Sequence, residues 1–148
     1  MFAKNSVKIA FASSDRRVVN QHFGAAEAFC IYQLSESSAN ESARLIEVAE
    51  FHDSEVAMDG HEGKLARKIE LLVGCAAVYC NAVGASAIKQ LLAAGLQPMK
   101  VEEGTSIEAL LCGLNHSLQH APPPWLAKRL QHKDADRFAA MAAEGWSE

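Results

Sequence analysis

The chain has 148 residues, a formal net charge of −4 and an apolar fraction of 49%. This length is that of one domain with its own hydrophobic core. Basic residues form no stripe or cluster, which argues against nucleic acid as a general partner. No apolar run approaches the roughly 20 residues that span a bilayer, and the first residues lack the apolar segment of a secretory signal. We therefore expect a cytoplasmic protein with no membrane partner.

The first half of the chain predicts three strands that form a meander. Residues 7–12 (VKIAFA) alternate apolar and other side chains with the period of a strand. Residues 29–34 and 43–51 predict the second and third strands. The polar segment 13–27 between the first two strands is long for a loop in a compact domain. Loops of this kind often carry function.

The second half alternates helices with strands. Apolar residues at helical spacing predict helices over residues 64–72 and 85–94, and Gly95 stands where a helix C-cap belongs. Between them, residues 76–80 (AAVYC) form a continuous apolar run, which is typical of a strand buried on both faces. Residues 98–101 predict a short last strand.

A third helix and a separate tail complete the predicted organisation. Residues 105–108 (TSIE) form a capping box that opens a helix with an apolar stripe. The three consecutive prolines at 122–124 end that helix. We therefore expect an α/β domain over residues 1–121 and a proline-led amphipathic helical tail over residues 122–148.

The order of these elements predicts one architecture. Three meandering strands followed by strand–helix–strand units favour a mixed five-stranded sheet with helices on both faces. The expected strand order is 3-2-1-4-5 in chain numbering, with the second strand antiparallel to its neighbours. This arrangement resembles the three-layer sandwich of the ribonuclease H-like fold.

The predicted topology also places a ligand site. In open α/β sheets, ligands bind at the carboxyl ends of two strands whose connections leave in opposite directions. Here those are the first and fourth strands, so residues 13–24 and 80–86 should meet in one crevice. The second of these segments opens a helix, and the N–H groups at a helix start favour an anion.

Two side chains in this crevice are candidate metal ligands. His22 lies in the long loop, within an HFG motif, and neutral imidazole binds metals such as iron well. Cys80 ends the buried fourth strand, and its thiolate would be a second soft ligand. The alternatives are a surface histidine of a loop and a cysteine that packs as a small apolar residue.

The remaining polar and sulfur-containing residues carry weaker signals. Ser13, Ser14 and Asp15 either hydrogen-bond a ligand or form a turn. The four cysteines include no CxxC pair, which excludes a zinc ribbon and a ferredoxin-type cluster site and predicts free thiols. Three of them are expected in the core, and five histidines are expected to face solvent: Cys30, Cys75 and Cys112; His52, His61, His116, His120 and His132.

Catalysis has little support in the sequence. Hydrolysis of the ribonuclease H type needs several converging carboxylates to hold two metal ions, and only Asp15 falls near the crevice. The chain contains no GxSxG, Walker or GxGxxG motif. We therefore expect a protein that is not an enzyme.

Several segments of the chain resemble one protein family. Residues 8–24 (KIAFASSDRRVVNQHFG), residues 76–104 (AAVYCNAVGASAIKQLLAAGLQPMKVEEG) and the segment PPPWLAKRL are similar to the dinitrogenase iron–molybdenum cofactor biosynthesis domain family. The likeness extends from residue 7 to residue 148. It implies a small carrier that binds iron–sulfur precursors of the nitrogenase cofactor, or the finished iron–molybdenum cofactor, as cargo.

The resemblance also implies site residues and partners. His22 is the expected cluster ligand, and Cys80 is the only cysteine in a stretch where some members have more. The expected partners are the precursor-synthesising enzyme, an assembly scaffold and apo-dinitrogenase, and the carrier would be a monomer or a cluster-bridged dimer. The residues expected around the cargo are Ser13, Ser14, Asp15, Arg16, Gly24, Gly84 and Ser86.

A second interpretation stays open. The domain, or its tail from Trp125 onward, would dock on apo-dinitrogenase or an assembly scaffold as a protein-interaction chaperone, without being the main cluster carrier. The tryptophans near the two ends of the tail, Trp125 and Trp146, motivate this interpretation.

Overall fold

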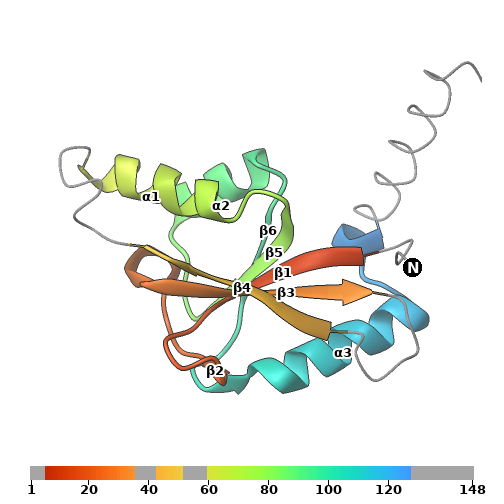
Figure 1. Cartoon of the computed structure of the whole chain (residues 1–148). Coiled ribbons are helices and arrows are strands. Elements are labelled where there is room, and N and C mark those ends of the chain that lie inside the picture. The colour runs from red at the N-terminus through yellow and green to blue at the C-terminus, as the bar shows by residue number, and fades with distance from the viewer. Residues whose placement is uncertain (1–5, 36–42, 52–59, 128–148) are drawn as a thin grey trace, which may run out of the picture.

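The computed structural model describes residues 6–35, 43–51 and 60–127. A mixed five-stranded sheet lies between two helical layers (Figure 1). Helices α1 (Gly60–Leu71) and α2 (Ala85–Ala93) cover one face of the sheet, and α3 (Ile107–Gln119) covers the other. The predicted α/β architecture with helices on both faces is confirmed.

The strand order of the sheet is β4-β3-β1-β5-β6, which confirms the predicted order. Strand β3 is antiparallel to both of its neighbours, whereas β1, β5 and β6 are mutually parallel. The strands are β1 (Ser6–Ala12), β3 (Ala28–Ser35), β4 (Ala43–Glu50), β5 (Cys75–Cys80) and β6 (Gln97–Lys100).

Two hydrophobic clusters hold the layers together. Alternate residues of β1 enter opposite clusters, so that Ala10 packs toward α1 and α2 while Ile9 packs toward α3. All six residues of β5 are buried, because helices cover both of its faces. This burial explains the uninterrupted apolar run in its sequence. Leu126, just beyond the three prolines, is also fully buried against the α3 cluster.

The long loop after β1 contains short regular elements that its sequence does not predict. Strand β2 (Val18–Val19) pairs antiparallel with β7 (Thr105–Ser106), which precedes α3. A single 3-10 turn, η1 (Phe23–Ala25), follows in the same loop. The partners in the β2–β7 pair are far apart in the chain, so no local pattern indicates them.

The β2–β7 pair also moves the start of α3. The capping-box pattern places the N-cap at Thr105, but Thr105 lies in extended backbone and its hydroxyl donates to the carbonyl of Glu102. Ser106 is the N-cap instead, and its side chain accepts a hydrogen bond of 3.1 Å from the amide of Ala109. Helix α1 likewise begins at Gly60, earlier than predicted.

The cysteines follow the prediction with one exception. Cys30 and Cys75 are buried, but Cys112 is exposed. The prediction for Cys112 is therefore wrong. Its neighbour Leu111 is one of the α3 side chains that pack against the sheet, and Cys112 lies on the exposed side of the helix. No helix of the described ranges is long and apolar enough to cross a bilayer.

His116 and His120 are exposed, as predicted. His52 and His132, together with the side chain of His61, lie outside the described part of the chain. The same is true of the tail beyond residue 127, including Trp146.

Candidate functional site

The two loops at the carboxyl ends of β1 and β5 are hydrogen-bonded to each other. The amide of Phe23 donates to the carbonyl of Ala82 over 2.8 Å, and the amide of Asn81 donates to the carbonyl of Gln21 over 2.9 Å. These bonds lie on either side of His22 along the chain. The loop that carries His22 is therefore attached to the segment directly after β5, which is the middle one of the three parallel strands.

His22 points outward while the residue after it points inward. The His22 side chain is exposed, and its carbonyl accepts a hydrogen bond of 3.1 Å from the amide of Ala25. Phe23 is fully buried and packs against Phe29, with ring centroids 5.6 Å apart. Burial of the phenylalanine holds the loop on the domain and leaves the imidazole accessible from solvent.

A buried lysine of α1 binds the inner side of the same loop. Lys68 is only 2% exposed, and its Nζ donates hydrogen bonds to the carbonyls of Phe23 (3.2 Å) and Gly24 (2.6 Å). The ammonium also lies 4.7 Å from the ring centroid of Phe51. Sequence reasoning missed this residue. Its one signal is its position, because Lys68 falls within the apolar stripe of α1, one turn after Leu65.

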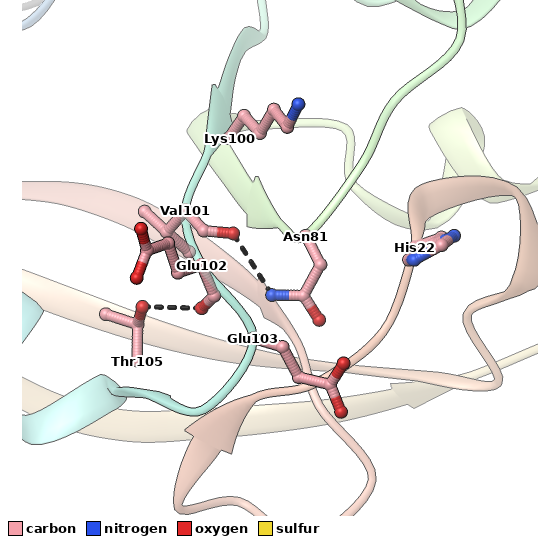
Figure 2. Close-up of a pocket in the computed structure, with 7 residues that line it drawn as sticks. All are labelled: His22, Asn81, Lys100, Val101, Glu102, Glu103 and Thr105. Atoms are coloured by element: carbon pink, nitrogen blue, oxygen red, sulfur yellow. Dashed lines mark hydrogen bonds between the residues drawn. The ribbon is translucent and has the colours of Figure 1, made fainter.

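Asn81 connects three segments behind His22. Its side-chain Nδ2 donates to the carbonyl of Val19 (3.0 Å) and to the carbonyl of Val101 (3.2 Å). Its backbone amide bonds the loop of Gln21. Figure 2 shows Asn81 between His22 on one side and the segment after β6 on the other. This residue follows β5 directly, where the sheet topology places a ligand site.

An open pocket of about 640 Å³ adjoins this connection. Its lining comes from the loop after β1, the segment after β5 and the segment after β6, so it includes residues of both predicted segments and extends toward β6. A histidine, a lysine and two glutamates are among its lining residues. The residues that line it are His22, Asn81, Lys100, Val101, Glu102, Glu103 and Thr105 (Figure 2).

His22 is the one predicted site residue among those that line this pocket. The segment 100–105 is absent from the predicted site, because sequence reasoning placed the crevice between β1 and β5 and gave β6 no part in it. Among the described residues, no three or more His, Cys, Asp or Glu side chains are arranged to hold a metal ion.

The polar run after β1 forms a closed turn. The buried hydroxyl oxygen of Ser13 accepts from the amide of Arg16 over 3.0 Å. The Asp15 carboxylate accepts from the amides of Arg17 (2.8 Å) and Val18 (3.1 Å), and these bonds lower the pKa of Asp15. The sequence leaves open whether Ser13, Ser14 and Asp15 contact a ligand or form a turn. The hydrogen bonds that they make are those of a turn.

Ser14 and Arg16 belong to the same turn. The amide and hydroxyl of Ser14 both bond the side chain of Asn20, at 3.0 and 2.9 Å. Arg16 has a φ of 66°, an uncommon backbone conformation for a residue other than glycine. The Arg16 side chain is exposed, but it does not line the pocket.

The residues predicted near β5 and α2 are divided between core and surface. Cys80 is fully buried, and burial raises the pKa of its thiol to about 11, so the thiol is protonated at neutral pH. Gly84 is the exposed N-cap of α2, and the exposed Ser86 accepts a hydrogen bond from Gln90. Gly24 is exposed beside His22.

Comparisons with known proteins place this chain in a family. Residues 5–116 match the family model described as "Dinitrogenase iron-molybdenum cofactor". The chain is 52% identical to protein NifX of Azotobacter vinelandii over 145 residues, which cover 96% of this chain and 88% of that protein. It is 33% identical to protein NifY of Klebsiella pneumoniae over 121 residues, covering 82% of this chain and 49% of that protein.

Among solved structures, the apo form of the orange protein from Desulfovibrio gigas has a similar fold. The TM-score is 0.51 at 20% sequence identity, over 79% of this chain and 92% of that one. This likeness concerns the fold alone. The family match covers most of the sequence, including the His22 loop and the segment after β5. This chain belongs to the dinitrogenase iron–molybdenum cofactor family.

Proposed function

We propose that this chain takes part in building the nitrogenase iron–molybdenum cofactor, as a carrier of its iron–sulfur precursor. Family membership and the 52% identity to NifX support this role. The structural observation that carries the proposal is the exposed His22 imidazole on a loop fixed to the domain on both sides. In this role the protein binds and passes on its cargo and does not transform it.

The chemistry of His22 suits reversible binding. Imidazole nitrogen is a good ligand for iron, and an exposed side chain reaches a cluster that is too large to enter the core. A preassembled cluster already has sulfides around its iron atoms, so one or two protein ligands suffice. Few ligands also ease transfer to the next protein, because fewer bonds must break.

The proposal gives the ligand role to His22 and not to Cys80. A protonated thiol that is fully buried reaches iron only after the strand end opens and the proton leaves. The exposed residues Arg16, Gly24, Gly84 and Ser86 remain candidates for contacts with the cargo at the rim of the site. The proposed partners are the enzyme that makes the precursor, an assembly scaffold and apo-dinitrogenase.

Anaerobic titration with the isolated precursor tests the proposal. The wild-type chain should form a stoichiometric complex that survives gel filtration, with its own visible absorption and paramagnetic signals. Replacing His22 by Ala should weaken binding by at least about tenfold, which corresponds to about 1.4 kcal/mol. Thermal unfolding of the variant should match the wild type, because the side chain is exposed.

His116→Ala is the matched control. His116 is also an exposed histidine, but it lies on α3, on the other face of the sheet. This variant should bind the precursor like the wild type. Absence of any complex at micromolar protein would refute the carrier role, and equal losses in both variants would remove His22 from its special role.

A further inference from the structure

The contacts of Lys68 define a role that the proposed function does not include. We propose that Lys68 is the positioning residue of the His22 site, which it serves by fixing the backbone carbonyls of Phe23 and Gly24. This inference rests on His22 being the cargo ligand. Lys68 would not touch the cargo, because its ammonium is directed at the underside of the loop.

Lys68 is buried although it lies on a surface helix. A lysine on a helix can extend its ammonium into water at little cost, yet this side chain is only 2% exposed. A buried ammonium is costly unless hydrogen bonds satisfy it. Here two loop carbonyls accept from it, and the Phe51 ring lies against it. The helix therefore uses its cation to bind this loop.

Lys68 also fixes the direction of two consecutive loop carbonyls. Hydrogen bonds to a charged donor are about twice as strong as those between neutral groups, and two of them hold consecutive carbonyls inward. The Phe23 ring is buried and its amide is bonded to Ala82. These contacts of the short segment therefore point into the domain. The His22 side chain and the Gly24 surface are left for the ligand.

The fixed peptide plane also indicates the chemistry of that ligand. The Phe23–Gly24 peptide bond is trans, so the amide N–H of Gly24 points opposite to the Phe23 carbonyl. Because that carbonyl faces Lys68, the Gly24 N–H is directed away from Lys68. Gly24 is exposed and lies near His22 in the chain. A ligand with a metal for the imidazole and a sulfide or other anionic acceptor for the N–H fits this pair.

Two measurements on Lys68→Met test the inference. Met keeps the length of the apolar stem and removes the donor. Amide hydrogen exchange at Phe23 and Ala25 should become at least about tenfold faster than in the wild type. The dissociation constant of the precursor should rise by about tenfold or more. Lys89→Met is the matched control, because it removes one charge from an exposed position of α2 and should change neither value.

Lys68→Gln is the second variant, in case Met at this position does not fold. Its amide still donates hydrogen bonds from a side chain one bond shorter, and its burial costs less than that of an ammonium. It should fold and show smaller changes of the same sign in both measurements.

The outcomes separate this inference from the proposed function. Faster loop exchange with unchanged precursor affinity would make Lys68 a structural contact only and overturn the inference. Unchanged exchange in a folded Lys68 variant would overturn it as well. If the wild-type chain binds no precursor, the proposed function fails, while the exchange measurement still shows whether Lys68 fixes the loop.

Discussion

The side-chain amide of Asn81 donates a hydrogen bond of 3.0 Å to the backbone carbonyl of Val19, across 62 positions of sequence. The same nitrogen bonds the carbonyl of Val101. One side chain thus joins the β2 loop, the end of β5 and the exit of β6. This junction sets the wall of the pocket beside His22.

Asn81→Ala should destabilise the domain by about 1–3 kcal/mol, because it removes the hydrogen bonds that the side chain donates to the Val19 and Val101 carbonyls. The Val19 carbonyl keeps its bond from the amide of Gly104. The change is measured as the free energy of unfolding in urea. Gln90→Ala is the control, since the Gln90 side chain donates to Ser86 on the surface of α2, and it should change stability by no more than about 0.5 kcal/mol. An Asn81 variant as stable as this control would show that the junction contributes nothing.

The turn after β1 predicts a pH dependence. The amides of Arg17 and Val18 lower the pKa of the Asp15 carboxyl from its ordinary value of 3.8. A carboxyl with a depressed folded-state pKa stabilises the fold fully above its unfolded-state pKa, and loses that contribution as pH falls through the folded-state value. Stability should therefore fall below about pH 4, with Asp15 as one contributor.

Asp15→Asn isolates this contribution. The variant should be less stable than the wild type at pH 7, and the difference should shrink between pH 4 and pH 2. Denaturant unfolding across this range gives the comparison, and an NMR titration of the Asp15 carboxyl should give a pKa below 3.8. A gap that stays constant with pH would contradict the assignment.

The cysteines should react at very different rates. Cys112 is exposed, whereas Cys80 is fully buried with its thiol pKa raised to about 11. At pH 8, about one Cys80 thiol in a thousand would be ionised even if reagent reached it. Iodoacetamide followed by mass spectrometry should label Cys112 at least about 100-fold faster than Cys80.

Two further variants complete this test. Cys112→Ser should remove the fast labelling. Cys80→Ala should leave precursor affinity within about threefold of the wild type, because His22 is the proposed ligand. Rapid labelling of Cys80 in the native protein, or lost affinity in Cys80→Ala, would give the Cys80 thiol a place in the site.

The sheet could be predicted because its determinants are local or follow general connection rules. Alternating apolar residues mark β1, and an uninterrupted apolar run marks β5, which helices cover on both faces. Short connections place β3 and β4 on one side of β1, and the preferred crossover places β5 and β6 on the other. The meeting of the two loops near His22 follows from that order.

The sequence by itself determined the strand order, the helical faces and His22 as the residue to test, since period, connection length and family motif are all properties of the chain as written. Only the tertiary structure decided that Lys68 is buried, that Asn81 bonds Val19 and Val101, and that the pocket lies toward β6. The physical reason is distance along the chain. A lysine in an apolar stripe and an asparagine after a strand have many possible partners, and the packed fold selects the carbonyls that they bind.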